Sequence, residues 1–164
     1  MIKIFLYSLF VFVFINNLSA QRRQNVTINV LGTTPLLGVK YDTRILKEQN
    51  NGFGLTAGVG SIELLDDGGD YEASLSFGTN YLFGKGRHQL LIGANIAFVF
   101  SRFYPLDSKP KNITRTMFIP DIGYRFSPTK KGFTGQLTWN PLKSNLDRES
   151  AYQYFGIGLG YSWK

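Results

Sequence analysis

The last eleven residues, YFGIGLGYSWK, alternate large and small side chains almost without a break. The large side chains share one parity: Phe155, Ile157, Leu159, Tyr161 and Trp163. The small ones share the other parity: Gly156, Gly158, Gly160 and Ser162. A period of two is the pattern of a β-strand, here with one bulky apolar face and one nearly bare face.

The same alternation recurs along the chain, and no stretch shows a sustained apolar period of 3.6 residues. In the second such segment, Val39 and Tyr41 oppose Lys40 and Asp42. The pattern predicts eight strands at about 24–31, 36–46, 53–64, 71–83, 88–101, 113–126, 133–140 and 151–163. Because no linker or low-complexity tract separates them, we expect one all-β domain.

The segments between these strands are of two kinds. KEQNNG, GKGRH and SPTKKG are short and contain glycine, as tight hairpin turns do. LDDGGD, RFYPLDSKPKN and PLKSNLDRES are longer and more varied, and GTTP is a short exception among them. Short turns at one end and longer loops at the other are typical of outer-membrane barrels. An even number of strands places both termini of the domain at the short-turn end, which is then periplasmic.

The first twenty residues, MIKIFLYSLFVFVFINNLSA, have the layout of a secretory signal peptide, with cleavage near Ala20. Lys3 supplies the positive charge, and the apolar run from Ile4 to Ile15 is shorter than the roughly 20 residues of a spanning helix. We therefore predict a signal peptide at 1–20 and a barrel domain at 21–164. Cysteine is absent, which excludes a small exported domain held together by disulfides.

The strand faces leave two orientations to compare. A soluble lipocalin-like barrel would hold the apolar face inside and bind an apolar ligand there. Eight strands, however, enclose an interior that ordinary side chains already fill, and the glycine-rich polar face fits that space better. The apolar face then points outward, which only lipid tolerates. The predicted fold is an eight-stranded antiparallel up-and-down transmembrane β-barrel in a bacterial outer membrane.

Seven charged residues fall on the predicted inner face. They are Lys40, Asp42, Arg44, Glu72, Arg115, Asp121 and Arg125. Such residues could line a polar pore or a binding site. Alternatively, they form a structural ion-pair network that fills the narrow lumen, each charge offsetting the burial of another. The near-balance of positive and negative charges favours the network.

The chain resembles small eight-stranded outer-membrane barrel proteins of the OmpA and OmpX type, and a group of outer-membrane β-barrel domain proteins without assigned chemistry. The resemblance rests on GVKYDTRIL, GTNYLFGKGRHQLLIGANI, IGYRFSPTKKGF and GIGLGYSW, which are spread over most of the domain. It implies the fold and the location, and no reaction. Gly158, Tyr161 and Trp163 resemble the C-terminal signal that the barrel-insertion machinery reads, except that Lys164 follows the final aromatic residue.

Two further groups of residues are candidate sites. A lipid-modifying barrel enzyme would need His88, the one histidine, as its base, with Asp107 and Ser108 as partners. The predicted strand at 88–101 lies between His88 and the other two residues and separates them by roughly 40 Å, which argues against this alternative. The carboxylates in LDDGGD, which are Asp66, Asp67 and Asp70, do not have the spacing of a twelve-residue calcium loop.

The sequence therefore predicts a non-enzymatic membrane barrel with a plugged lumen, no cofactor and no metal. The net charge of +7 is spread over turns, loops and strand interiors, so we expect no nucleic-acid partner. The expected partners are outer-membrane lipid, lipopolysaccharide, the barrel-insertion machinery during assembly, and an unknown surface partner that meets the longer loops. Lys109, Lys111, Lys143 and Arg148 are loop cations that could touch surface phosphates.

Overall fold

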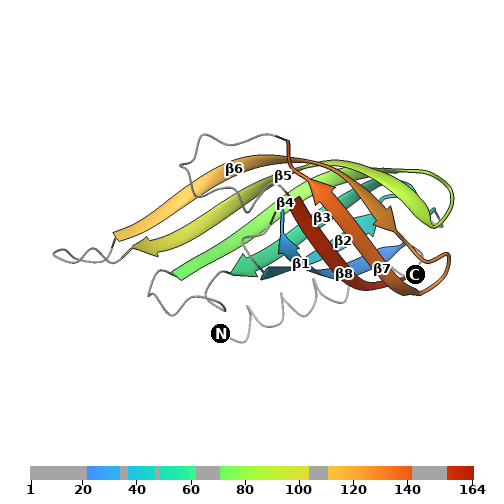
Figure 1. Ribbon diagram of the computed structural model, residues 1–164, viewed down its shortest axis with the longest axis horizontal. Helices are drawn as coiled ribbons and strands as arrows, with labels where there is room; N and C mark the ends of the chain where they lie inside the picture. The colour runs from blue at the N-terminus through green and yellow to red at the C-terminus, as the bar shows by residue number, and fades with distance from the viewer. Residues whose placement is uncertain (1–21, 34–36, 47–48, 62–70, 104–110, 142–154) are drawn as a thin grey trace, which may run out of the picture.

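The structure is a computed structural model that describes residues 22–33, 37–46, 49–61, 71–103, 111–141 and 155–164 (Figure 1). These residues form eight strands: β1 Gln24–Leu31, β2 Leu37–Arg44, β3 Gly52–Ser61, β4 Tyr71–Phe83, β5 His88–Phe103, β6 Lys111–Phe126, β7 Gly132–Trp139 and β8 Phe155–Trp163. Every predicted strand is confirmed, with its ends moved by a few residues where they are described. In the described part of the chain, no helix is long and apolar enough to cross a membrane. The predicted signal peptide at 1–20 and the predicted strand start at 151–154 lie outside the described residues.

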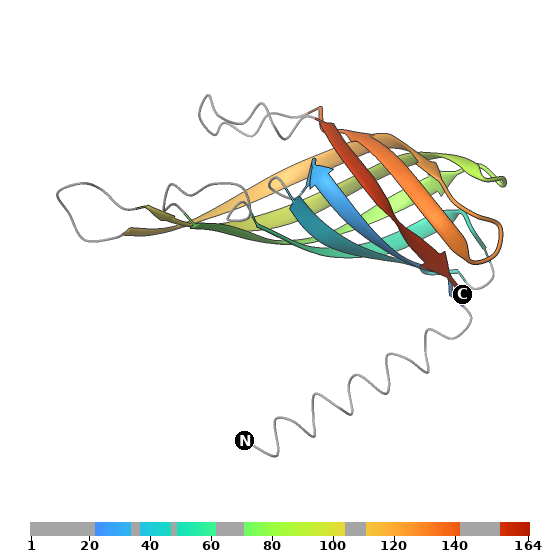
Figure 2. The same ribbon diagram turned by 60° about the horizontal axis from the view of Figure 1, so that its bottom comes forward.

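The strands follow one another around a closed barrel, each antiparallel to its neighbours. The C-terminal strand β8 completes the circle by pairing with β1, from Gln24 opposite Trp163 to Leu31 opposite Gly156 (Figure 2). The all-β, eight-stranded antiparallel up-and-down fold is therefore confirmed. Because a closed barrel has no first or last edge, the backbone groups of β1 and β8 satisfy each other.

The outer surface of the barrel is apolar. Ile28 on β1 is 58 % exposed and Leu159, its neighbour on β8, is 54 % exposed. On the opposite faces of the same strands, Thr27 and Ser162 are buried. This alternation confirms that the apolar face points outward. The lipocalin-like alternative is wrong, because it requires that face inside.

The inner wall is not uniformly small and polar as predicted. Four buried apolar side chains form a cluster on β5 and β6: Ala97, Val99, Met117 and Ile119. The reason lies in the neighbouring strands, since one level of the inner wall runs from Gly58 through Ser76 and Ala97 to Met117. Where β3 and β4 contribute glycine and serine, bulkier side chains from β5 and β6 occupy the remaining space, which keeps the interior close-packed.

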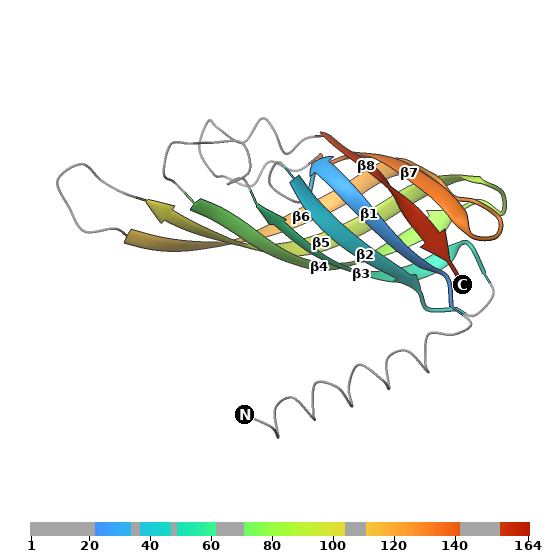
Figure 3. The same cartoon turned by 90° about the horizontal axis from the view of Figure 1, so that it is seen from below.

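Strands β5 and β6 are longer than the rest and, with β4, extend beyond β1 and β8 at the long-loop end (Figure 3). The pairing of β6 with β7 covers only Ile122 to Phe126 on the β6 side. Pro120 stands just outside that paired stretch, and its carbonyl accepts a hydrogen bond from Asn140 Nδ2. In an antiparallel strand the N–H and C=O of one residue point to the same side. An N–H at position 120 would therefore point toward β7, as the carbonyl does, and proline has no N–H. The proline therefore falls where pairing with β7 has ended.

Candidate functional site in the barrel lumen

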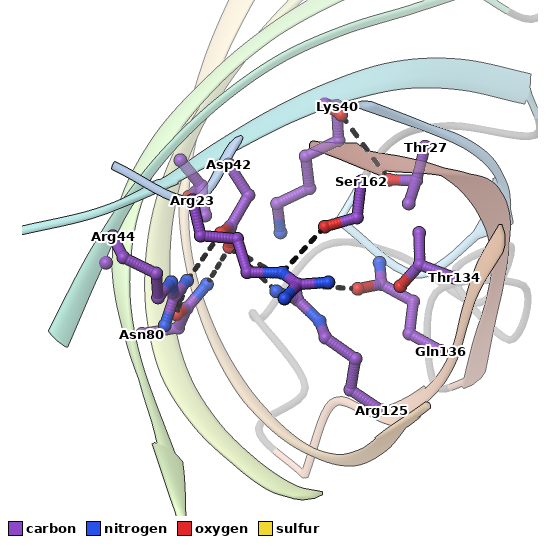
Figure 4. Close-up of polar contacts among 12 residues, drawn as sticks. Arg23, Thr27, Lys40, Asp42, Arg44, Asn80, Arg125, Thr134, Gln136 and Ser162 are labelled. Atoms are coloured by element: carbon purple, nitrogen blue, oxygen red, sulfur yellow. Dashed lines mark hydrogen bonds and ion pairs between the residues drawn. The ribbon is translucent and has the colours of Figure 1, made fainter. Parts of the chain in front are cut away.

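Asp42 on β2 is the centre of a buried polar network inside the barrel (Figure 4). Its carboxylate accepts hydrogen bonds from Arg44 Nη2 at 2.5 Å and from Asn80 Nδ2 on β4 at 2.6 Å. On the far side of the lumen, Arg125 on β6 lies 3.2 Å from the same carboxylate. The carboxylate therefore joins strands that are not neighbours in the sheet, and its charge is shared between two guanidinium groups.

Arg44 occupies space that a glycine leaves open on the next strand. Gly54 on β3 pairs directly with Arg44, and a Cβ atom at Gly54 would overlap the guanidinium group. The guanidinium also donates to Asn80 Oδ1 at 2.5 Å and to the Gly52 carbonyl at 2.9 Å. The bare glycine face that the sequence shows is thus what admits long cationic side chains to a narrow interior.

Asp121 on β6 is the second buried carboxylate. Lys40 Nζ lies 3.6 Å from Asp121 Oδ2, and Asn95 Nδ2 on β5 donates to that oxygen at 2.6 Å. Asn140, which follows β7, donates to the other carboxylate oxygen at 2.5 Å. The side-chain amides supply the hydrogen bonds that a buried carboxylate requires beyond its single cation.

Arg125 connects the network to the seam of the barrel. Its Nη2 donates to Gln136 Oε1 on β7 at 2.8 Å, and Gln136 Nε2 donates to Asn29 Oδ1 on β1 at 2.8 Å. Gly158 of β8 lies between β7 and β1, and a Cβ atom there would collide with Asn29 and Gln136. The network therefore crosses the interior from β2 to β1 by way of β6 and β7.

Arg23, which immediately precedes β1, closes the short-turn end of the lumen. Its guanidinium donates to Ser162 Oγ at 2.9 Å, to Asn50 Oδ1 at 2.6 Å and to the carbonyls of Pro128, Thr129 and Lys130. None of these acceptors is a carboxylate. Burial, with a smaller contribution from Arg125 and Arg44, lowers the pKa of Arg23 from its ordinary value. Arginine remains protonated in proteins, so a cation fills this end of the barrel.

Five of the seven residues predicted to face inward form ion pairs around the two buried carboxylates: Lys40, Asp42, Arg44, Asp121 and Arg125. Arg115 lies further along β6, half-buried and paired with Val99, and forms none of these ion pairs. Glu72 belongs to β4, but its side chain is outside the described part of the structure. Sequence reasoning missed Arg23, although its position has the same parity as the inward-facing Asn25, Thr27 and Asn29.

The charge of the lumen is less balanced than the sequence indicated. In the described interior, four buried cations (Arg23, Lys40, Arg44 and Arg125) face two buried carboxylates. The remaining polar partners are neutral amides, hydroxyls and backbone carbonyls. This arrangement can bind charges and hold strands together, but the described lumen pairs no hydroxyl nucleophile with a histidine or carboxylate base.

The structure describes one of the three candidate enzyme residues. His88 is exposed at the short-turn end of β5, where its ring contacts Tyr124 and Phe126 on the outer face. Asp107 and Ser108 lie outside the described residues, as does the acidic segment with Asp66, Asp67 and Asp70. The loop residues Lys109, Lys143 and Arg148 are also outside, and only the backbone of Lys111 is described.

The predicted assembly signal lies on β8. Gly158 faces inward, whereas Tyr161 points outward and stacks on Trp163 with ring centroids 6.5 Å apart. The role of these residues in barrel insertion stays a prediction.

Comparison with known proteins gives a likeness of fold. No family model matches the chain, and no curated protein matches its sequence. Among solved structures, the N-terminal β-barrel domain of Pseudomonas aeruginosa OprF superimposes with a TM-score of 0.58 and 14 % sequence identity. The match covers 87 % of this chain and 96 % of the OprF domain. The chain thus has the fold of that barrel domain, which confirms the resemblance to small eight-stranded barrels at the level of fold.

Proposed function

We propose that this chain is a non-enzymatic integral protein of a bacterial outer membrane whose lumen is closed by polar side chains. The observation that carries the proposal is the inside-out distribution of polarity. Large apolar side chains on β1, β3, β5 and β8 are exposed, whereas charged and amide side chains are buried. In water such a surface would drive aggregation, whereas in a bilayer it is the surface that lipid covers.

Closure of the lumen is supported by the contacts of the two carboxylates. Asp42 and Asp121 bring together side chains from β2, β4, β5 and β6, and Arg125 extends the set to β7 and β1. Arg23 fills the short-turn end. An ion would have to displace bonds between buried charges to pass, which is costly in a low-dielectric interior.

A structural or surface-interaction role follows from what the lumen contains. Its described groups hold one another and provide no catalytic pair, and the single histidine lies on the outer face. Recognition would then belong to the longer loops, with lipopolysaccharide phosphates or a surface protein as partner. The outward Tyr161 and Trp163 on the closing strand are suited to recognition by the insertion machinery.

Conductance tests the proposed closure. The purified protein, reconstituted in a planar bilayer of zwitterionic lipid, is expected to show no steady channel. The variant Arg23→Ala/Asp42→Ala/Arg44→Ala/Arg125→Ala removes the cation at the short-turn end together with the central carboxylate and both of its guanidinium partners, and should show steady channels. Steady channels from the unmodified protein, or silence from a correctly inserted quadruple variant, would show that these side chains are not what closes the barrel.

A further inference from the structure

Two neighbouring turns gather four exposed cations at the short-turn end. The turn from β4 to β5 carries Lys85 and Arg87, and the turn from β6 to β7 carries Lys130 and Lys131. The turns lie side by side, because the N–H of Ser127 donates to the carbonyl of Arg87 at 2.8 Å. We call these four side chains the basic rim.

No carboxylate side chain accompanies the basic rim among the described residues of this end, which are 22–25, 44–46, 49–52, 83–90, 123–134 and 161–164. Both described aspartates are buried in the lumen and already bound to cations. Among these described residues the side-chain charge of the rim is therefore uncompensated, and repulsion between its members favours an external anion.

Arg23 determines how the second turn presents its lysines. Its guanidinium takes up the carbonyls of Pro128, Thr129 and Lys130 from the lumen side. These contacts hold the backbone of the turn in place and cover the oxygens that would otherwise weaken its positive potential. The side chains of Lys130 and Lys131 remain exposed.

An aromatic cluster places the rim at a definite depth. The His88 ring lies 5.6 Å from that of Phe126 and hydrogen-bonds with the hydroxyl of Tyr124, all on the outer face of β5 and β6. Phe83 and Phe133, at the adjoining ends of β4 and β7, are also exposed. Aromatic residues of this kind lie at the boundary between acyl chains and headgroups, so the rim just beyond them reaches the level of lipid phosphates.

We infer that the basic rim binds the headgroups of anionic glycerophospholipids in the leaflet at the short-turn end. Lysine and arginine both donate charge-assisted hydrogen bonds to phosphate oxygens, and basic residues next to a bilayer attract anionic lipid. The inference rests on the proposed insertion of the barrel in a membrane. The proposed ligand is the phosphate group of a bilayer lipid, in contact with residues at the ends of β4, β5, β6 and β7.

The two tryptophans allow a direct test, because they stand at opposite ends of the barrel. Trp163 ends β8 beside Ser162, which pairs with Gly132 at the end of the second basic turn, whereas Trp139 ends β7 at the other side of the membrane. Trp139→Phe leaves Trp163 as the reporter. The vesicles are phosphatidylcholine with the same mole fraction of either brominated phosphatidylglycerol or brominated phosphatidylcholine. Quenching of Trp163 should indicate a local concentration of brominated phosphatidylglycerol about fivefold higher than that of brominated phosphatidylcholine.

Charge-neutral and charge-conserving variants separate the rim from the rest of the barrel. In the Trp139→Phe background, Lys85→Gln/Arg87→Gln/Lys130→Gln/Lys131→Gln should abolish the enrichment, and Lys85→Arg/Lys130→Arg/Lys131→Arg should retain it. Trp163→Phe in the otherwise unmodified protein leaves Trp139 as the reporter, and Trp139 should show no enrichment of phosphatidylglycerol. Equal quenching of Trp163 by both lipids, or enrichment that survives in the neutral variant, overturns the inference. If brominated phosphatidylcholine quenches neither tryptophan, the barrel is not inserted, and the proposed function fails together with the inference.

Discussion

Replacing Asp42 with alanine is expected to lower the free energy of unfolding by about 3–5 kcal/mol, because two buried guanidinium groups lose their shared counter-ion. Asn80 would lose its acceptor at the same time. The measurement is urea unfolding of the protein refolded in lipid vesicles, followed by the fraction that keeps the mobility of the folded form on a gel.

Two controls distinguish loss of the charge from loss of volume. Asp42→Asn keeps the shape and removes only the charge, so it should retain most of the destabilisation. Thr43→Ala, one residue on and directed to the other face, should change the unfolding free energy by no more than about 0.5 kcal/mol. A loss below about 1 kcal/mol for Asp42→Ala would mean that Arg44 and Arg125 do not depend on this carboxylate.

Leu159→Arg is expected to lower the free energy of unfolding by about 2–4 kcal/mol. The side chain points outward midway along β8, so a charge there enters the hydrocarbon core. Leu159 pairs with Ile28 on one side and Gly135 on the other, so no polar neighbour shelters the new charge. The same vesicle-based unfolding measurement gives the value.

The matched control places the same charge at a different depth. Phe133 is 58 % exposed, but it lies near the start of β7, close to the basic turn. Phe133→Arg should cost about 0–1 kcal/mol, since the arginine can reach the headgroup region. Equal tolerance of arginine at both positions would show that the outer face of β8 does not meet hydrocarbon.

The sequence was sufficient for the strands and their faces because alternation is a local property. The parity of Val39 and Tyr41 places Lys40 and Asp42 together on the opposite face, and the small interior of an eight-stranded barrel makes that face the inner one. Parity fixes the direction of a side chain, and the closed eight-stranded barrel then follows from the number of strands and from the glycine-rich inner face.

The partners inside the lumen could not be predicted in the same way. Whether Asp42 meets Arg125 depends on the register of strands that are far apart in sequence, and that register follows from closure of the whole barrel. The bond between Gln136 and Asn29 crosses the seam at β8, so no local pattern reveals it. Arg23 was missed because it precedes the first predicted strand, so the alternation assigned it to neither face. Parity also directs Met117 and Ile119 inward, but the space that admits their apolar side chains is left by small residues of other strands, which no local pattern reveals.

We propose that the apolar face of this closed barrel lies in lipid. The most direct test is to isolate the outer-membrane fraction of expressing cells, extract it with detergent, and compare the mobility of the protein on a gel before and after boiling. We expect a membrane-bound band whose mobility changes on boiling, because the closed barrel resists detergent until it is heated. A soluble periplasmic band that boiling does not shift would show that the apolar face does not lie in lipid.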